Sequence, residues 1–415
     1  MNNRHLLVRL RVFLQGARTT GFAATVGARV GRLFRDTIIW LAFLPVTCVL
    51  HLLGFRRLTV ITSRIGHLAV EVDCFLKAKA LGDLPARRFF LLAPPGAIAN
   101  THLLEYWRPH LPVVTHPLAC VVLSGMSRWW LMRYDVGHYA FRLNLSQEMY
   151  RLNARWPPRP PLLMLSQEDQ TWADDAFAKL GLPPDAWFVC VHVREPGFSP
   201  VDEAQHAHRN ADPHAAIPAM RYIAERGGWC IRMGDSSMTP LPNLPNVIDY
   251  AHYPLKSHRL DVVLCARARF FLGNTSGIAL VSTVFGVPSA LANMVPTTTL
   301  APLKGDLSIP KLLFSRKEQR LLRFSEIFAS PLANFRFAEL YDEAEVDLCE
   351  NGPDEIVDLA REMLDRLEGK VVEHDEDADL QRRYLGLFRP GDYSWGAVSR
   401  IGLSFLRKYR PLLVP

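Results

Sequence analysis

The sequence predicts an α/β protein with two domains, each built around a parallel sheet. The chain has 415 residues, enough for two domains of ~100 to 200 residues with further segments besides. Apolar residues make up 49% and charged residues 21%, which excludes the disordered, collagen-like and repetitive classes. Short apolar runs typical of strands alternate with segments of helical periodicity, the pattern of a parallel sheet covered by helices.

The N-terminal end is strongly basic. Residues 1–64 contain ten Arg, no Lys and one acid, Asp36, giving +9, whereas the other 351 residues sum to −2. A basic charge confined to one end argues against a body that binds nucleic acid and favours contact with anionic lipid. The seven Cys are scattered and form no CxxC motif, which fits reduced thiols in a cytoplasmic compartment.

An apolar run, Thr37 to Leu53, contains no acid, Lys or Arg. As a helix it reaches about 25 Å, the lower limit for crossing a bilayer. It is therefore a monotopic or re-entrant membrane anchor, a single span, or a buried helix. Residues 1–35 place seven Arg among apolar residues, as an interfacial helix requires. The tail from Arg400 to Pro415 has a similar composition and is either a second basic amphipathic segment or a helix that closes a core.

The first domain is expected to begin with a strand, a glycine loop and a helix. The expected strands are 57–62, 88–93 and 119–124, and the first helix is 68–81. The stretch Trp156 to Pro161 cannot hold a helix or a central strand, because Pro lacks the N–H and favours extended geometry before it. We therefore divide the chain into a membrane-associated segment 1–55, an N-terminal Rossmann-like domain 56–160, a C-terminal Rossmann-like domain 161–370, and an acidic connector with a basic tail 371–415.

The second domain repeats the alternation after a helical stretch, Gln167 to Leu180. Expected strands are 187–193, 228–233, 247–250, 268–273 and 288–291, with helices 213–226, 260–266 and 276–285 between them and a later helix 353–367. Two consecutive open α/β halves bind a ligand at the carboxyl ends of their strands. We therefore expect two domains facing a ligand-binding cleft.

Two strand ends in the second domain present cations. His192 and Arg194 end a buried strand and point to one face, because side chains alternate along a strand. Arg232 ends the next strand, and Gly234 would let a ligand approach the backbone closely. Two Arg at adjacent strand ends suit a diphosphate. Alternatively, Arg194 forms an ion pair with Glu203 or Asp212.

A third strand end carries polar groups in the sequence Asn274, Thr275, Ser276, Gly277. Hydroxyls and backbone N–H groups there would lie at the positive end of the following helix, where anions bind. Helix capping alone also explains Thr275 or Ser276. Three features suited to binding phosphate occur at successive strand ends. Together they favour a nucleotide-diphosphate site over separate ion pairing and helix capping.

These motifs resemble a family of little-characterised bacterial glycosyltransferases. The resemblance rests on HVREPGF, HRNAD, GWCIRMGD, IDYA and LGNTSGIALVSTVFGVP, in this order between residues 192 and 288. HVR is also similar to the HxR motif of fucosyltransferases of the two-Rossmann GT-B fold, although Glu195 and Pro196 depart from the usual HxRRxD. The resemblance implies a GT-B fold and a donor site made of His192, Arg194, Asn210, Asp212, Arg232, Gly234, Asp249, Asn274, Thr275, Ser276 and Gly277.

In the first domain, Gly66 and His67 follow the first strand and resemble the Gly-His loop that places a general base near the acceptor in several GT-B enzymes. Imidazole titrates near neutrality and can take the proton of an attacking hydroxyl. His67 is therefore the expected base, and Arg194 is the second expected catalytic residue, which would bind the diphosphate. The alternatives are that His67 only caps a helix, or that Glu71, Asp73 or Glu195 is the base.

No metal site is expected. Asp375, Asp377 and Asp379 form a DxD pattern, but they lie in what the sequence suggests is a polar connector rather than at a strand end. We expect a metal-independent hexosyltransferase that needs no cofactor besides its nucleotide-diphospho-sugar. It would act on a glycan or glycolipid acceptor in surface-polysaccharide synthesis at the cytoplasmic face of the inner membrane. The alternatives are a nucleotide-sugar epimerase or hydrolase of the same fold, and a noncatalytic glycan-binding scaffold.

Overall fold

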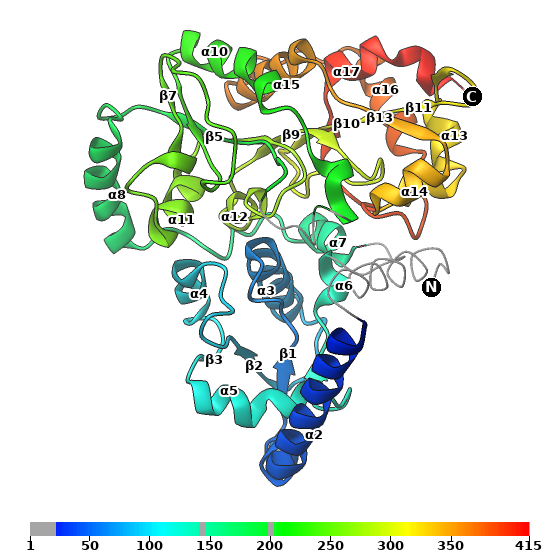
Figure 1. Cartoon of the computed structure of the whole chain (residues 1–415). Coiled ribbons are helices and arrows are strands. Elements are labelled where there is room, and N and C mark those ends of the chain that lie inside the picture. The colour runs from blue at the N-terminus through cyan, green and yellow to red at the C-terminus, as the bar shows by residue number, and fades with distance from the viewer. Residues whose placement is uncertain (1–21, 141–146, 198–202, 204, 415) are drawn as a thin grey trace. The chain divides into compact units, whose positions relative to one another are not determined.

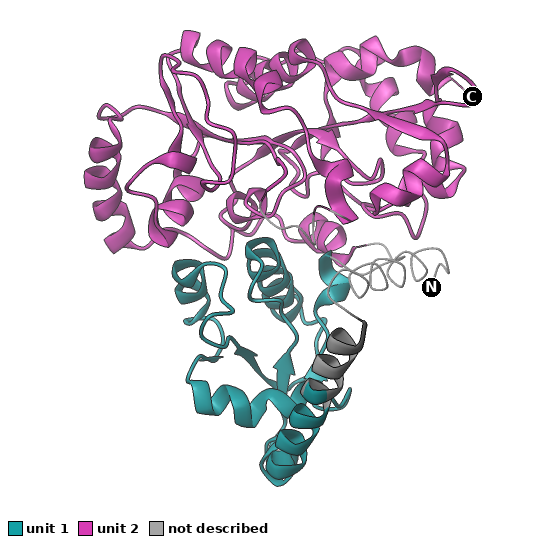
Figure 2. Ribbon diagram, viewed as in Figure 1, with its two compact units in different colours: residues 1–143 teal, residues 144–415 magenta. Residues whose placement is uncertain are grey.

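The computed structural model describes residues 22–140, 147–197, 203 and 205–414, and within these ranges it describes side chains from Phe34 onward. The sequence prediction for residues 1–21 lies outside them. The chain divides into two compact units, Met1–Leu143 and Asn144–Pro415 (Figure 2). Each contains a parallel sheet with helices (Figure 1), which confirms the predicted α/β fold class. The stretch Trp156 to Pro161, which the sequence predicts to link the two sheets, lies within unit 2.

Unit 1 is built around four parallel strands. In spatial order they are β3 (Val113–Val114), β2 (Arg88–Leu92), β1 (Phe55–Leu58) and β4 (Arg133–Tyr134). Two of the expected strands are therefore present, although β1 begins and ends earlier than the β-branched residues suggested. β3 and β4 are each two residues long, too short for a periodic pattern to reveal them.

One face of this sheet packs against α3 (Ile65–Ala80), the helix predicted after the first strand. Twelve residues of α3 are buried, and the Phe75 ring meets Phe89 of β2 edge to face at 4.9 Å. The neighbouring helices are α4 (Thr101–Trp107) and α6 (Gly137–Ala140). Because α3 follows β1 directly, its first turn lies at the carboxyl end of the sheet.

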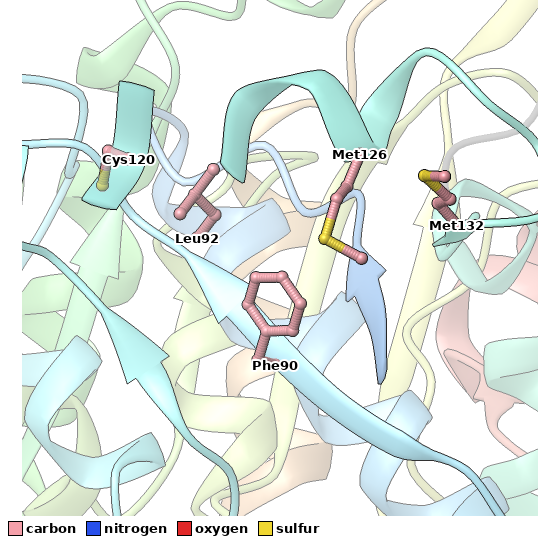
Figure 3. Packing of buried hydrophobic residues seen from close by; sticks show 5 residues of the cluster. All are labelled: Phe90, Leu92, Cys120, Met126 and Met132. Carbon is pink, nitrogen blue, oxygen red and sulfur yellow. The ribbon is translucent and has the colours of Figure 1, made fainter. Parts of the chain in front are cut away.

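The opposite face is covered by α2 (Phe22–Leu52) and α5 (Pro117–Ser124). Figure 3 shows the resulting core, which consists of Phe90, Leu92, Cys120, Met126 and Met132. Cys48 and Leu50 of α2 pack against it. The buried-helix interpretation thus applies to one side of α2.

The prediction of a strand at 119–124 was wrong, because these residues form most of α5. Pro117 occupies the first turn of this helix, where its missing N–H costs nothing. Cys120 is buried, whereas Leu118 and Val121 are exposed. A short apolar run cannot be assigned to helix or strand by periodicity alone.

Unit 2 contains a seven-stranded parallel sheet. In spatial order its strands are β14 (Arg400–Ile401), β10 (Leu307–Pro310), β9 (Ser289–Met294), β8 (Phe271–Gly273), β5 (Phe188–His192), β6 (Trp229–Arg232) and β7 (Val247–Ile248). The five strands expected in this half are all present, and β10 and β14 extend the sheet beyond them. β5 is central and pairs with β6 and β8, so the loops after these strands meet at one edge.

The helices of unit 2 largely follow the prediction. They are α7 (Glu148–Arg155), α8 (Gln167–Leu180), α10 (Ile217–Glu225), α11 (His258–Arg267), α12 (Ala279–Val284), α13 (Phe324–Phe328), α14 (Ala338–Glu343) and α15 (Pro353–Leu367). A small antiparallel sheet, β12-β11-β13, is formed by Arg320–Leu321, Leu312–Ser315 and Val346–Cys349. α12 begins three residues later than expected, so residues 274–278 form a loop instead.

The C-terminal segment completes unit 2. The acidic stretch 373–379 was expected to be a connector, but α16 (Asp375–Leu385) begins within it. Acidic side chains in a first turn are favourable because they face the positive end of the helix dipole. α17 (Leu403–Lys408) buries Leu403, Phe405 and Leu406, so the tail closes a core, as one of the two interpretations proposed.

Candidate functional site

The loops after β5 and β8 are joined by Arg194 and Asn274. The Arg194 backbone N–H donates to Asn274 Oδ1 at 3.0 Å, and the Asn274 amide group donates to the Arg209 carbonyl at 3.1 Å. Asn274 is 1% exposed. Its side chain therefore connects three loops at the carboxyl edge of the sheet, a structural task that the sequence did not suggest.

The Arg194 side chain points toward the short helix η2 (Ala207–Arg209). Its Nη1 donates to the His206 carbonyl at 3.1 Å and to Asn210 Oδ1, and lies 3.9 Å from Glu203 Oε2. The Asn210 amide group donates to Glu203 Oε1 at 2.6 Å. The alternative of an ion pair with Glu203 is thus present in the structure, while the Arg194 side chain remains 15% exposed.

Two further cations converge on the same loops. Arg209 Nη2 donates to the Thr275 carbonyl at 2.7 Å, which places a guanidinium beside the β8 loop. Lys311 follows β10, is 3% exposed, and donates from Nζ to the Asn210 carbonyl at 2.6 Å. Glu350 Oε1 lies 3.4 Å from the same Nζ, and burial lowers the pKa of Lys311.

His208 lies at the centre of this group and is 8% exposed. Neither ring nitrogen has a hydrogen-bond partner among the described residues. Burial, followed by the charges of Arg209 and of nearby Lys311 and Arg194, lowers the pKa of His208 to about 2. The ring is therefore neutral at physiological pH. We call Arg194, His206, His208, Arg209 and Lys311 the cation cluster.

Its charge suits an anion. The three basic side chains Arg194, Arg209 and Lys311 face two partner carboxylates, Glu203 and Glu350, and neutral His208 offers a further donor and acceptor. Buried polar nitrogens without partners are uncommon in folded proteins and need an explanation such as a ligand or ordered water. Ser276 Oγ in the β8 loop is also buried without a partner among the described residues.

Arg232 is placed differently from the sequence expectation. Its guanidinium is 2% exposed and donates to Glu195 Oε1 at 2.6 Å, Asp249 Oδ1 at 3.1 Å and the Thr239 carbonyl at 3.1 Å. Glu195 also accepts the Thr239 N–H at 2.9 Å. Arg232, Glu195 and Asp249 thus form a buried ion network, and a diphosphate could reach Arg232 only by displacing these partners.

Other residues of the expected site have local roles. His192 donates from Nδ1 to the Met233 carbonyl at 3.0 Å, and burial lowers its pKa to about 4. Gly234 has φ +151°, and a Cβ there would lie 1.9 Å from Met238 Sδ. The space beside Gly234 is therefore occupied by Met238 and is not open to a ligand.

Asp212 caps the short helix that follows it, accepting the His214 N–H at 2.9 Å. Thr275 Oγ1 lies 3.5 Å from Met294 Sδ. Gly277 is in the turn before α12, and its carbonyl accepts the Leu280 N–H at 3.3 Å. Because α12 begins at Ala279, Thr275 and Ser276 do not cap it, and their side chains belong to the loop.

Unit 1 contains a separate pair of titratable groups at the start of α3. His67 Nδ1 lies 2.9 Å from Glu71 Oε1, one helical turn later, and the Glu71 side chain is 2% exposed. Since a carboxylate only accepts, Nδ1 carries the hydrogen and Nε2 is the nitrogen able to take a proton. Glu71 Oε2 also accepts the Ile61 N–H at 3.4 Å. Two of the expected candidate bases are therefore joined in one dyad.

Asp73, the third candidate base, is fully buried and pairs with Lys77 Nζ at 2.7 Å. Burial raises the pKa of Asp73. A carboxylate that is enclosed and paired in this way stabilises α3 and cannot meet a substrate. His67 remains the more accessible group, with a side chain 16% exposed.

The DxD pattern lies on α16. Asp377 accepts from Arg407 Nε at 2.7 Å and Nη2 at 2.6 Å, and this pairing lowers its pKa to about 2. Asp379 pairs with Arg383 at 2.6 Å. Within the described residues, no group of three or more His, Cys, Asp or Glu is arranged to hold a metal ion.

Sequence reasoning missed four members of this site: His206, His208, Arg209 and Lys311. The first three lie in or beside the HRNAD motif, which was recognised without assigning roles to them. Lys311 follows a strand that the alternation pattern did not reach. A cation directly after an apolar strand was the signal available there.

No protein-family model and no curated protein matches the chain. Among solved structures, it is similar to a glycosyl transferase family 9 protein from Veillonella parvula, with 9% identity over 75% of this chain and 97% of that chain and a TM-score of 0.42. It is also similar to the E. coli ADP-heptose LPS heptosyltransferase II, with 12% identity over 75% and 99% of the two chains and a TM-score of 0.38.

A third similar structure is an iron-containing dodecameric glycosyltransferase from enterotoxigenic E. coli, with 10% identity over 77% of each chain and a TM-score of 0.37. Similarity at these levels assigns neither a reaction nor a substrate to this chain.

Proposed function

We propose that this protein is a glycosyltransferase of the GT-B type, which transfers a sugar from a nucleotide-diphospho-sugar to a glycan or glycolipid acceptor. Unit 2 would bind the donor and unit 1 would supply the base. The acceptor would belong to surface-polysaccharide synthesis at the cytoplasmic face of the inner membrane. These assignments follow the family resemblance of the strand-end motifs and agree with two parallel α/β units.

The cation cluster is the observation that carries the proposal. Parallel sheets bind ligands at the carboxyl ends of their strands, and there Arg194, Arg209 and Lys311 bond to loops near a buried histidine without hydrogen-bond partners among the described residues. A diphosphate would accept hydrogen bonds from the guanidinium groups and from His208. Its negative charge would also offset the mutual repulsion of the cations.

The proposed transfer step assigns a role to each of these groups. The acceptor hydroxyl oxygen forms a bond to the anomeric carbon, while the bond from that carbon to the diphosphate oxygen breaks. The electron pair of the broken bond leaves on the nucleoside diphosphate, whose charge the cation cluster stabilises. The hydroxyl proton passes to Nε2 of His67, and Glu71 stabilises the resulting imidazolium through Nδ1.

The test is calorimetry and thermal shift with a panel of UDP-, GDP-, ADP- and CMP-sugars. A ligand at 100 times its Kd should stabilise the chain by ~2.7 kcal/mol. For the nucleotide that binds, Arg194→Ala and Arg209→Ala should each cost on the order of 1.5 to 3 kcal/mol of affinity. His208→Phe keeps a ring beside Tyr341 but removes both nitrogens, and should also weaken binding.

Arg382→Ala is the matched control, because this guanidinium is 74% exposed on α16. It should leave nucleotide binding unchanged. A protein that binds no nucleotide would support the noncatalytic scaffold. Conversion of free nucleotide-sugar without any acceptor would support the epimerase or hydrolase.

A further inference from the structure

Unit 1 carries a wide exposed apolar surface on the side of its sheet covered by α2 and α5. We call it the apolar face. It consists of Phe34, Ile38, Leu41, Val49, Leu52, Leu118, Val121, Trp129, Trp130 and Leu131. Monomeric soluble proteins rarely expose so many large apolar side chains together, and such patches mark sites of interaction with proteins or membranes.

The α2 part of this face is a single stripe. Its residues Phe34, Ile38, Leu41, Val49 and Leu52 are separated by multiples of three and four positions, so they lie along one side of the helix. Leu52 is 83% exposed. The other side faces the protein, because Thr47 is fully buried. One side of α2 therefore belongs to the fold of unit 1, whereas the residues of the stripe are exposed.

The second part of the face comes from α5 and the turn after it. Leu118 and Trp130 are 71% and 76% exposed, although Cys120 on α5 is buried in the core. Trp129 lies beside α2, because its ring is 5.7 Å from the half-buried Trp40 ring on the side of α2 that faces unit 1. Arg128 also donates to Thr37 Oγ1 of α2 at 3.1 Å. The two exposed parts thus belong to neighbouring segments that are distant in sequence.

The charge of unit 1 identifies the partner. Residues 1–143 contain 18 Lys and Arg but 6 Asp and Glu, giving +12, whereas residues 144–415 contain 30 and 35, giving −5. Several of the cations are exposed on the elements that form or flank the apolar face: Arg35, Arg87, Arg88, Arg128 and Arg133. Exposed Trp and Leu among Arg match the interface of an anionic bilayer, where apolar side chains enter the lipid and cations meet the headgroups.

We propose that unit 1 binds an anionic lipid bilayer through the whole apolar face, with α2 lying in the plane of the membrane. This extends the membrane association contained in the proposed function by naming the surface and its orientation. α5 and Trp130 take part, although neither belongs to the apolar segment that the sequence singled out.

Helix α2 is long enough to cross a bilayer. Phe34–Leu52 is the one candidate span among the described residues, and 19 residues reach ~28 Å. However, α2 is held against unit 1 from Thr37, which accepts from Arg128, to Cys48 and Leu50, which pack on the core around Phe90. A spanning helix would have to leave these contacts and expose the core. An in-plane helix keeps them and buries only the exposed stripe.

The first experiment measures binding of the full-length chain to vesicles without any donor. We expect flotation with phosphatidylglycerol vesicles, weaker flotation with phosphatidylcholine, and release by high salt because screening weakens the Arg contacts. Leu118→Glu with Trp130→Glu should lower the bound fraction at least about tenfold, since both side chains would lose apolar burial. Deleting residues 1–55 would be less informative, because Cys48 and Leu50 support the core.

The matched control is Met164→Glu with Val372→Glu. These residues are 71% and 72% exposed on unit 2, so the pair adds the same charge to exposed apolar positions that do not belong to the apolar face. It should bind vesicles like the parent. Unchanged binding of the Leu118 and Trp130 variant would overturn the proposal, and so would an equal loss in the control.

The second experiment distinguishes an in-plane from a spanning helix. A fluorophore is attached at Leu41→Cys or Leu118→Cys, after the two partly exposed thiols, Cys48 and Cys349, are replaced by Ala. Quenching by nitroxide lipids should place both labels at a similar shallow depth. A deep label at Leu41 with Leu118 in water would overturn the orientation.

A second copy of the chain is the other occupant to exclude. If it covers the apolar face, sedimentation should show a dimer without lipid, dissociated by the Leu118 and Trp130 substitutions, and vesicles would bind neither form. That result would refute membrane binding and leave the transfer reaction untouched, because nucleotide binding is measured separately.

Discussion

Replacing Arg232 with Met should destabilise unit 2 while leaving nucleotide affinity nearly unchanged. Met has a similar length but cannot pair with a carboxylate. The substitution removes the contacts to Glu195, Asp249 and the Thr239 carbonyl. Breaking a buried ion pair by removing one partner costs about 3 to 5 kcal/mol, because the other charge stays buried and unpaired.

The three contacts of Arg232 contribute unequally. Glu195 is 4% exposed and cannot recover its lost partner from water, whereas Asp249 is 20% exposed and partly can. Most of the cost therefore comes from Glu195. Adding Glu195→Gln should restore about 1 to 3 kcal/mol, because the amide removes the buried charge and its oxygen can still accept the Thr239 N–H.

The assay is urea unfolding followed by circular dichroism, with nucleotide affinity measured by calorimetry on the folded variants. Arg382→Met is the control: its pair with Asp379 is exposed, so the unfolding free energy should change by less than about 0.5 kcal/mol. The structural role of Arg232 is refuted if Arg232→Met keeps the parental stability but loses tenfold or more in nucleotide affinity. That outcome would support the sequence-based prediction that Arg232 binds the donor.

Three further predictions follow from the other titratable and acidic groups. His67→Ala should lower kcat by ~10²- to 10⁴-fold with little change in donor Kd. Glu71→Gln should lower kcat less and alter the pH profile of kcat. If His67→Ala instead lowers the melting temperature and leaves kcat near the parental value, His67 only stabilises α3. Transfer activity should persist in EDTA, and activity restored only by Mg²⁺ or Mn²⁺ would promote Asp375 and Asp377 as ligands. Burial raises the pKa of Asp306 to about 7, compared with 3.8 in the unfolded chain. Between these two values the folded state binds one proton more than the unfolded state. The free energy of unfolding should therefore fall by on the order of 4 kcal/mol as pH rises from about 4 to 7. Asp306→Asn should flatten this dependence in urea unfolding, and an unchanged slope would contradict it.

Five strands of unit 2 could be predicted because each is a short buried run followed by a turn. β5 and β6 match the apolar runs almost residue for residue, since a strand buried on both faces is apolar along its whole length. α5 could not be predicted in this way. Its eight residues are too few to show a helical period, and its partners on β2 are distant in sequence.

The candidate site was predictable where a residue type and its position suffice. Arg194 and Asn274 were chosen because they follow strands, and β5 and β8 are neighbours in the sheet. The role of Lys311 depends on a loop more than a hundred residues from Arg194, and no local pattern indicates that the two converge on His208.

Arg232 illustrates why a strand-end cation alone does not identify a phosphate site. Its position at the end of a buried strand satisfied every local criterion for a phosphate-binding cation. However, Glu195 on the neighbouring loop forms a buried ion pair with it. The same carboxylate interrupts the fucosyltransferase-like pattern directly after Arg194. Glu195 is buried directly after Arg194, and its charge is balanced by Arg232. The departure from the motif and the enclosed Arg232 are therefore one structural feature, and the two residues should be substituted together if the phosphate-binding pattern is to be restored.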